Sequence, residues 1–168
     1  DVRTTRTQYD AAGRITAELS GVGSAALDAL VTPTPLQIDA VWNVYAVHHT
    51  YNQAGQRLKS VAQNGQTTWY YYDEAGRLNA TIQSADGGLS SSGAILANQG
   101  DVSLLTYNSF GQVVDTTKLN QRIPTTGLTG GAYSSIATTV TALLDANAST
   151  THVKYTLRGA VREAIDAL

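Results

Sequence analysis

Tyr72-Asp73-Glu74-Ala75-Gly76-Arg77-Leu78 is the stretch of sequence that decides the fold. An Asp after the tyrosine accepts a hydrogen bond from the backbone two residues on. A glycine three positions later supplies the positive φ that closes a type I turn with a bulge. The tyrosine ends one strand and the aliphatic residue begins the next. The phrase therefore predicts a β-hairpin turn in which Asp73 and Gly76 are the structural residues.

The same phrase occurs five times along the chain, with Asp or Asn in its second position in four copies and Thr156 in a degraded fifth. Tyr51 and Tyr72 stand 21 residues apart, and the other copies follow this spacing with insertions. The tyrosines of the five copies are Tyr9, Tyr51, Tyr72, Tyr107 and Tyr155. The further turn residues that the copies predict are Asp10, Gly13, Asn52, Gly55, Asn108, Gly111 and Gly159. We expect the five tyrosines to occupy equivalent strand ends and to stack as a ladder.

The segment between two copies shows what one repeat contains. Strand-like residues at 58–62 lead into Asn64-Gly65, a strong signal for a two-residue hairpin, and then into a second strand at 67–72. Hairpins of this size cannot bury a hydrophobic face alone, so they must pack edge to edge. The predicted fold class is all-β: antiparallel β-hairpin repeats forming an elongated, curved or spiralling sheet, with short helical turns in insertions.

Three stretches interrupt the repeat, at approximately 21–41, 84–101 and 124–151. Residues 22–32 are rich in Ala and Leu and predict one or two helical turns, which Pro33 and Pro35 would end. The second stretch is rich in Gly and Ser and predicts a long polar loop. In the third, the spacing of apolar residues over 136–147 predicts a short amphipathic helix. Such insertions are where additional function is most readily acquired.

The composition limits the classes of protein to which this chain can belong. A chain of 168 residues with 42% hydrophobic content predicts one folded domain over 1–168. The formal net charge is −2 and the basic residues are scattered, so no nucleic-acid partner is expected. Without cysteine there is no disulfide or thiolate metal site, and no apolar stretch is long enough for a membrane span. Because the chain starts at Asp1 and lacks methionine, we expect a piece of a longer protein.

Residues suited to catalysis or metal binding are sparse. His48 and His49 are adjacent, and neighbouring residues on a strand point to opposite faces, so we expect no shared metal ligand there. No nucleophile elbow, P-loop or zinc-protease helix motif occurs. Calcium at Asp86 and Asp101 stays open, although the ligand spacing of known calcium loops is missing. The sequence predicts no catalytic residue, no cofactor and no metal.

The repeated phrase resembles the YD repeats of bacterial Rhs proteins, of the C-type subunits of insecticidal toxin complexes, and of animal teneurins. The resemblance implies β-hairpins coiled into a hollow shell, which in the bacterial members encloses a toxic polypeptide. It also implies a secreted or surface-exposed protein of bacterial origin, with neighbouring repeats or an enclosed polypeptide as partners. This chain departs from the pattern in its insertions and in Thr156, which replaces the turn acid of the fifth copy. It contains no Asp-Pro pair, so the self-cleavage of some members is not expected.

Two functions follow as hypotheses. The first is a non-enzymatic scaffold, part of a shell or stalk that encloses or presents another polypeptide such as a toxin. The alternative is a binding module that recognises a glycan or a host surface protein through exposed aromatic residues and the insertion loops. The aromatic residues outside the repeated phrase that could contact such a ligand are Trp42, Trp69 and Tyr133.

Overall fold

The structure, a computed structural model, describes residues 4–85, 97–144 and 148–166. They form two compact units, Asp1–Thr67 and Thr68–Leu168. The described residues contain twelve strands, paired antiparallel except for one short parallel pair, together with three α-helices and one 3-10 turn. The predicted all-β fold of antiparallel hairpins, with short helices in the insertions, is confirmed.

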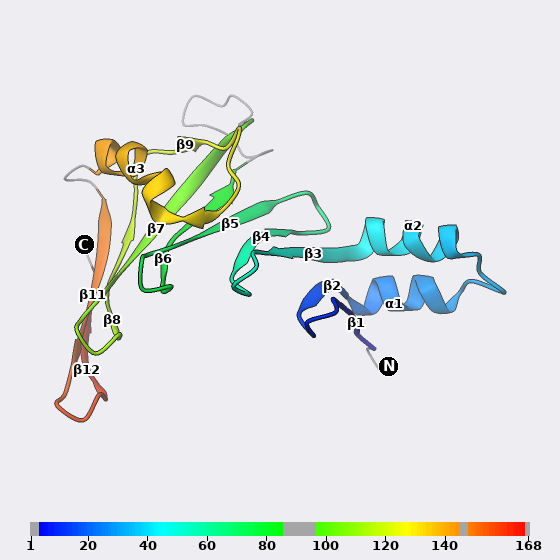
Figure 1. Ribbon diagram of the computed structural model, residues 1–168, viewed down its shortest axis with the longest axis horizontal. Coiled ribbons are helices and arrows are strands. Elements are labelled where there is room, and N and C mark those ends of the chain that lie inside the picture. The colour runs from blue at the N-terminus through cyan, green and yellow to red at the C-terminus, as the bar shows by residue number, and fades with distance from the viewer. Residues whose placement is uncertain (1–3, 86–96, 145–147, 167–168) are drawn as a thin grey trace. The chain divides into compact units, whose positions relative to one another are not determined.

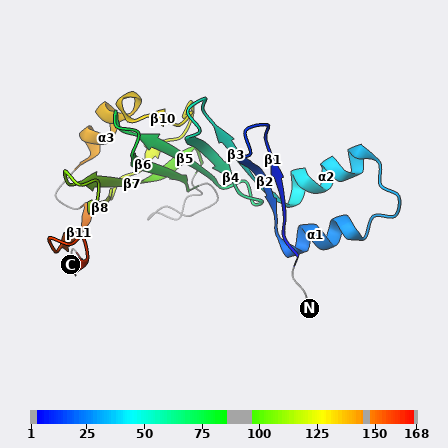
Figure 2. The ribbon, with the colours of Figure 1, turned by 60° about the horizontal axis from the view of Figure 1, so that its bottom comes forward.

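The first unit is built from two hairpins and a helical insertion. Its strands pair antiparallel in chain order and are β1 (Arg6–Tyr9), β2 (Ile15–Leu19), β3 (Ala46–Tyr51) and β4 (Arg57–Val61). Two helices, α1 (Gly21–Asp28) and α2 (Pro35–Tyr45), connect β2 to β3 and lie side by side (Figures 1 and 2). The small core of this unit consists of Ala17, Leu19, Trp42 and Ala46.

The helical insertion differs from its prediction. The first helix ends at Asp28, inside the predicted range, but Pro35 begins a second helix that was not predicted. Proline suits the first helical position because its missing N–H would have no partner there. The Thr34 hydroxyl accepts from the backbone N–H of Gln37, whose side chain accepts in return from the N–H of Thr34. The inserted segment therefore extends to Tyr45, beyond the predicted limit at 41.

The second unit is a larger antiparallel sheet. In spatial order its main strands are β5 (Thr67–Tyr72), β6 (Leu78–Ser84), β7 (Gln99–Tyr107), β8 (Val113–Lys118), β11 (Ser149–Tyr155) and β12 (Val161–Ile165). Two short strands add to it: β9 (Ile123–Pro124) pairs with β7, and β10 (Gly131–Ala132) pairs with β5 in parallel.

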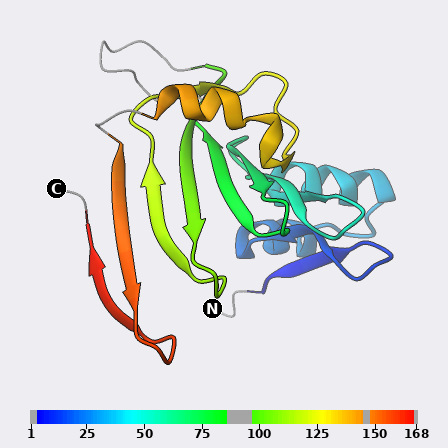
Figure 3. The same ribbon diagram turned by 60° about the vertical axis from the view of Figure 1, so that its left-hand side comes forward.

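One face of this sheet carries the main hydrophobic core. The 3-10 turn η1 (Tyr133–Ser135) leads into α3 (Ala137–Leu143), which crosses the face of the strands (Figure 3). Ile136 and Val140 are buried there against the sheet. Their partners include Trp69, Tyr71, Ala80, Ile82, Val102 and Leu104. The predicted helix over 136–147 is thus present but shorter, because Leu144 is already extended.

The second predicted insertion, 84–101, is partly outside the described residues, which omit 86–96. At its far end the structure differs from the predicted loop, because β7 begins at Gln99 and Gly100 pairs with Ser84. Close packing explains the glycine: a Cβ added at position 100 would lie 2.7 Å from the Cγ2 of Ile82. Strand pairing therefore extends further into this stretch than its polar composition suggested.

The Asn64-Gly65 turn also differs from its prediction. The N–H of Ala62 donates to the carbonyl of Gln66 at 2.8 Å, and the N–H of Gly65 donates back to Ala62 at 2.9 Å. These are the bonds of a type I turn with a bulge rather than of a two-residue hairpin. The turn at Asp73 has the same pattern, so turns with and without the repeated phrase share one geometry.

Candidate functional site: the junctions between hairpins

The tyrosine of one copy of the repeated phrase is hydrogen-bonded to the preceding copy. In each case the phenolic hydroxyl donates to the backbone carbonyl of the aliphatic residue that closes the earlier phrase. The three bonds join Tyr51 to Ile15 at 2.7 Å, Tyr107 to Leu78 at 2.5 Å and Tyr155 to Val113 at 2.7 Å. We call each such contact a hairpin junction. The junctions fix successive hairpins to one another through the same atoms.

Arginine covers the tyrosine ring at two of these junctions. The guanidinium carbon of Arg14 lies 5.1 Å from the ring centroid of Tyr51, and that of Arg77 lies 4.6 Å from the centroid of Tyr107. Both distances are within the range of cation–π attraction. Arg14 also donates to the backbone carbonyl of Asn52 at 2.8 Å. The residue after the turn glycine therefore helps to hold the next hairpin.

The turn acid orients this arginine. Asp73 accepts hydrogen bonds from the backbone N–H and the Nε of Arg77, both at 2.8 Å. Asp10 accepts from the same two groups of Arg14, at 2.9 and 2.6 Å. The acid thus closes its own turn and also holds the side chain that covers the next tyrosine.

The two copies with Asn at the turn position carry Gln in place of Arg. Asn52 donates to the side chain of Gln56 at 2.7 Å, and Asn108 donates to that of Gln112 at 2.8 Å. The turn residues were predicted from the sequence, but these partners were not. The signal was present, since Asp occurs with Arg and Asn occurs with Gln at a fixed spacing of four.

The hydrogen bonds lower the pKa of the turn acids. For Asp10 the backbone bond from Arg14 is the main cause, and it lowers the pKa below its ordinary value of 3.8. For Asp73 burial alone would raise the pKa, but the hydrogen bonds and the charge of Arg77 lower it. Both carboxylates are therefore ionised at neutral pH and available to bind arginine.

The first, third and fifth copies complete the series. The Tyr9 side chain belongs to the first copy and is 62% exposed. Tyr72 pairs with Leu78 across the β5–β6 ladder. In the fifth copy the hydroxyl of Thr156 accepts from the N–H of Ala160 at 3.2 Å. Alanine stands there where other copies have Arg or Gln, so this turn offers no side chain to a following hairpin.

The glycines of the five copies adopt one conformation. Their φ values lie between 76° and 82° at Gly13, Gly55, Gly76, Gly111 and Gly159. At Gly13 an added Cβ would meet nothing within 4 Å. The left-handed backbone, rather than lack of space, is what requires glycine there.

The aromatic residues considered for ligand binding are in or beside the cores. Trp42 and Trp69 are each 8% exposed. Tyr133 is partly buried against the core of the second unit, and burial raises the pKa of its hydroxyl. This placement does not support the interpretation of the two tryptophans as stacking platforms for a ligand.

The histidines of the first unit have separate surroundings. The ring of His48 bonds through Nε2 to the carbonyl of Trp42 at 3.2 Å. His49 is almost buried; its Nδ1 lies 2.9 Å from the Ser60 hydroxyl and its Nε2 lies 3.7 Å from a carboxylate oxygen of Glu18. Across 4–85, 97–144 and 148–166, no three acidic or histidine side chains gather as a metal site. No helix among those residues has the length and apolarity needed to cross a membrane.

Comparison with known proteins gives one family match and several similar solved structures. The RHS Repeat family matches residues 51–89. Crystal structures of TcdB2-TccC3-Cdc42, of TcdB2-TccC3-TEV and of TcdB2-TccC3 without its hypervariable C-terminal region are similar at 16% identity and a TM-score of 0.33. They cover 96–97% of this chain, which spans only 9% of theirs. No curated protein sequence matched.

Removing a junction hydroxyl should destabilise the second unit. Tyr107→Phe leaves the carbonyl of Leu78 without its donor, and we expect the free energy of unfolding to fall by about 1 kcal/mol. Urea titration followed by fluorescence measures the change. Tyr9→Phe is the matched control, because the Tyr9 hydroxyl has no such bond in the described part of the chain, and it should change stability by less than about 0.5 kcal/mol. Equal losses from both variants would contradict the junction role.

The pairing of turn residues should be visible in a double-mutant cycle. Asp73→Asn and Arg77→Gln each break the pair at one end, so each alone should destabilise the second unit. Combined, they recreate the amide pair that Asn108 and Gln112 form, and stability should recover in part. We expect a coupling energy of roughly 0.5 kcal/mol, measured by urea unfolding. Strictly additive effects would show that the two side chains act independently.

The first unit should lose stability in mild acid because of His49. Burial lowers the pKa of His49 below its ordinary value of 6.5, and the charge of Arg57 lowers it further, although Glu18 opposes both effects. Above 6.5 the ring is neutral in the folded and unfolded chain; below it, the unfolded chain binds the proton more readily. Unfolding free energy should therefore fall between about pH 7 and about pH 5.

This pH dependence can be measured through Trp42, the single tryptophan of the first unit, in a Trp69→Phe background. His49→Gln keeps a polar side chain and removes the titrating ring, so its stability should change less over the same pH range. If the variant loses as much stability as the parent, then another group causes the pH dependence.

Proposed function

We propose that this chain, which contains repeats of the RHS family, is a section of a non-enzymatic scaffold that encloses or presents another polypeptide. The observation that carries the proposal is the repeated hairpin junction. At the junctions of Tyr51, Tyr107 and Tyr155 the side chains of the repeated phrase bond to a neighbouring hairpin or to their own turn. These polar side chains therefore hold hairpins together, which is what a scaffold requires.

The wider role follows from the resemblance of the phrase to bacterial YD-repeat proteins. In those proteins such hairpins form a shell around a toxic polypeptide. We infer a similar place for this chain, in a secreted or surface-exposed bacterial protein. An enclosed polypeptide or further repeats would then be its partners.

The glycan-binding alternative has less support, because the tryptophans it would use are buried. A ligand screen separates the two functions. A ligand present at 100 times its dissociation constant adds about 2.7 kcal/mol to the folded state, which thermal unfolding detects readily. The scaffold function predicts that neither calcium nor any member of a glycan panel raises the melting temperature.

Thermal unfolding also tests the scaffold function directly. A triple variant with Tyr51, Tyr107 and Tyr155 each changed to Phe should melt at a lower temperature, with losses that add across the separate junctions. A clear upward shift with one glycan, retained in the triple variant, would overturn the scaffold function in favour of the binding module.

A further inference from the structure

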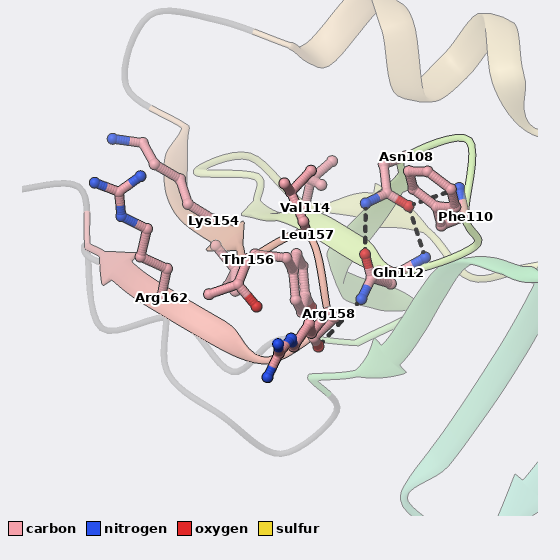
Figure 4. Close-up of a pocket in the computed structure, with 12 residues that line it drawn as sticks. Asn108, Phe110, Gln112, Val114, Lys154, Thr156, Leu157, Arg158 and Arg162 are labelled. Atoms are coloured by element: carbon pink, nitrogen blue, oxygen red, sulfur yellow. Dashed lines mark hydrogen bonds between the residues drawn. The ribbon is translucent and has the colours of Figure 1, made fainter.

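A groove lies between the turn of the fourth copy and the hairpin formed by β11 and β12. Its volume is about 1180 Å³, and twelve residues line it. Figure 4 shows Phe110 and Gln112 at one side, Lys154 and Arg162 at the other, and Leu157 between them. The groove is larger than the pockets of about 300–1,000 Å³ that usually hold small molecules.

Two apolar residues of this groove are unusually exposed. Phe110, the single phenylalanine of the chain, is 87% exposed, and Leu157 is completely exposed. In the first three copies the position of Phe110 is occupied by alanine, at Ala12, Ala54 and Ala75. Large apolar side chains at turn tips cost solubility and do nothing for the turn itself. Exposed apolar clusters of this kind often mark a contact surface.

The charged residues that line the groove are all basic. Its basic residues are Lys154, Arg158 and Arg162, and no acidic residue lines it. Lys154 is paired with Glu163 at 3.0 Å, but within the described residues neither arginine has a hydrogen-bond or ion-pair partner.

The repeat explains this imbalance. The two turns beside the groove have neutral residues, Asn108 and Thr156, at the position where the first and third copies have Asp10 and Asp73. The fourth copy also has Gln112 in place of arginine, so no cation is bound over the Tyr155 ring by its own neighbour, in contrast to Tyr107. An acid in place of Thr156 would lie in the lining of the groove, and its absence leaves the charges of Arg158 and Arg162 unbalanced there.

We propose that this groove binds an extended polypeptide segment that carries acidic and apolar side chains. The carboxylates would pair with Arg158 and Arg162, as arginine binds carboxylate through two parallel hydrogen bonds. Apolar side chains would cover Leu157 and Phe110. A polypeptide fits better than a nucleic acid, because the chain is net negative and only two unpaired arginines line the groove. The inference goes beyond the scaffold function and does not rest on it.

Fluorescence anisotropy with the whole chain tests the proposal. The probe is a fluorescein-labelled peptide of about eight residues composed of Glu, Leu and Phe, which is a typical length for one extended segment. A second peptide has Lys in place of each Glu. We expect the acidic peptide to bind, with an affinity that falls as salt is added, and the basic peptide not to bind.

Two matched double variants locate the site. Arg158→Gln with Arg162→Gln removes two charges from the groove and should weaken binding of the acidic peptide roughly tenfold. Lys118→Gln with Arg122→Gln removes the same charge outside the groove and should leave binding unchanged. Leu157→Ser should weaken binding, whereas Val31→Ser, at another exposed position, should not.

Three results would overturn the proposal: no binding of the acidic peptide, equal losses from the two double variants, or a single-stranded oligonucleotide that binds as tightly as the peptide. The scaffold function would survive each of them, because it depends on the tyrosine junctions and is tested by their melting temperatures.

Discussion

The hydrogen bond from a tyrosine hydroxyl to the carbonyl of the preceding hairpin is the contact on which the rest of this structure depends. A single bond of this kind contributes only about 1 kcal/mol. It recurs at equivalent atoms in Tyr51, Tyr107 and Tyr155, and so it imposes the same placement of one hairpin on the next each time. Strand ladders alone could slip in register; a side-chain bond to one specific carbonyl selects a single register.

The insertions are accommodated because they leave these junctions intact. The helical pair α1 and α2 separates Ile15 from Tyr51 in sequence, yet the two residues still meet through the hydroxyl. Likewise α3 lies between β8 and β11 in sequence, and Tyr155 still reaches Val113. In the second unit the inserted helix also covers the apolar face of the sheet, through Ile136 and Val140. Insertion there adds core without disturbing the repeat.

The sequence was sufficient to predict the hairpins, because the turn chemistry of Asp or Asn followed by Gly depends on only a few neighbouring residues. It was insufficient wherever a contact joined distant copies. The bond of Tyr107 to Leu78 requires knowing which carbonyl faces the ring, and no local pattern contains that. The second helix was missed because Pro35 was read as a terminator, although proline also begins helices. The burial of the two tryptophans was not predicted, because Trp42 lies on α2 and Trp69 on β5, and which face of each element packs against a core depends on contacts with distant residues.

The covariation of turn residues within this one chain bears on how such a repeat can change without losing its fold. Asp with Arg and Asn with Gln both satisfy the turn, but only the arginine also covers the next tyrosine. A copy can therefore exchange one pair for the other and keep the hydrogen bonds of its own turn. The exchange removes the arginine that contacts the tyrosine ring of the following hairpin. Where this exchange coincides with loss of the acid in the next turn, as at Asn108 and Thr156, a groove lies between the two hairpins, and this groove is the surface for which we propose a polypeptide ligand.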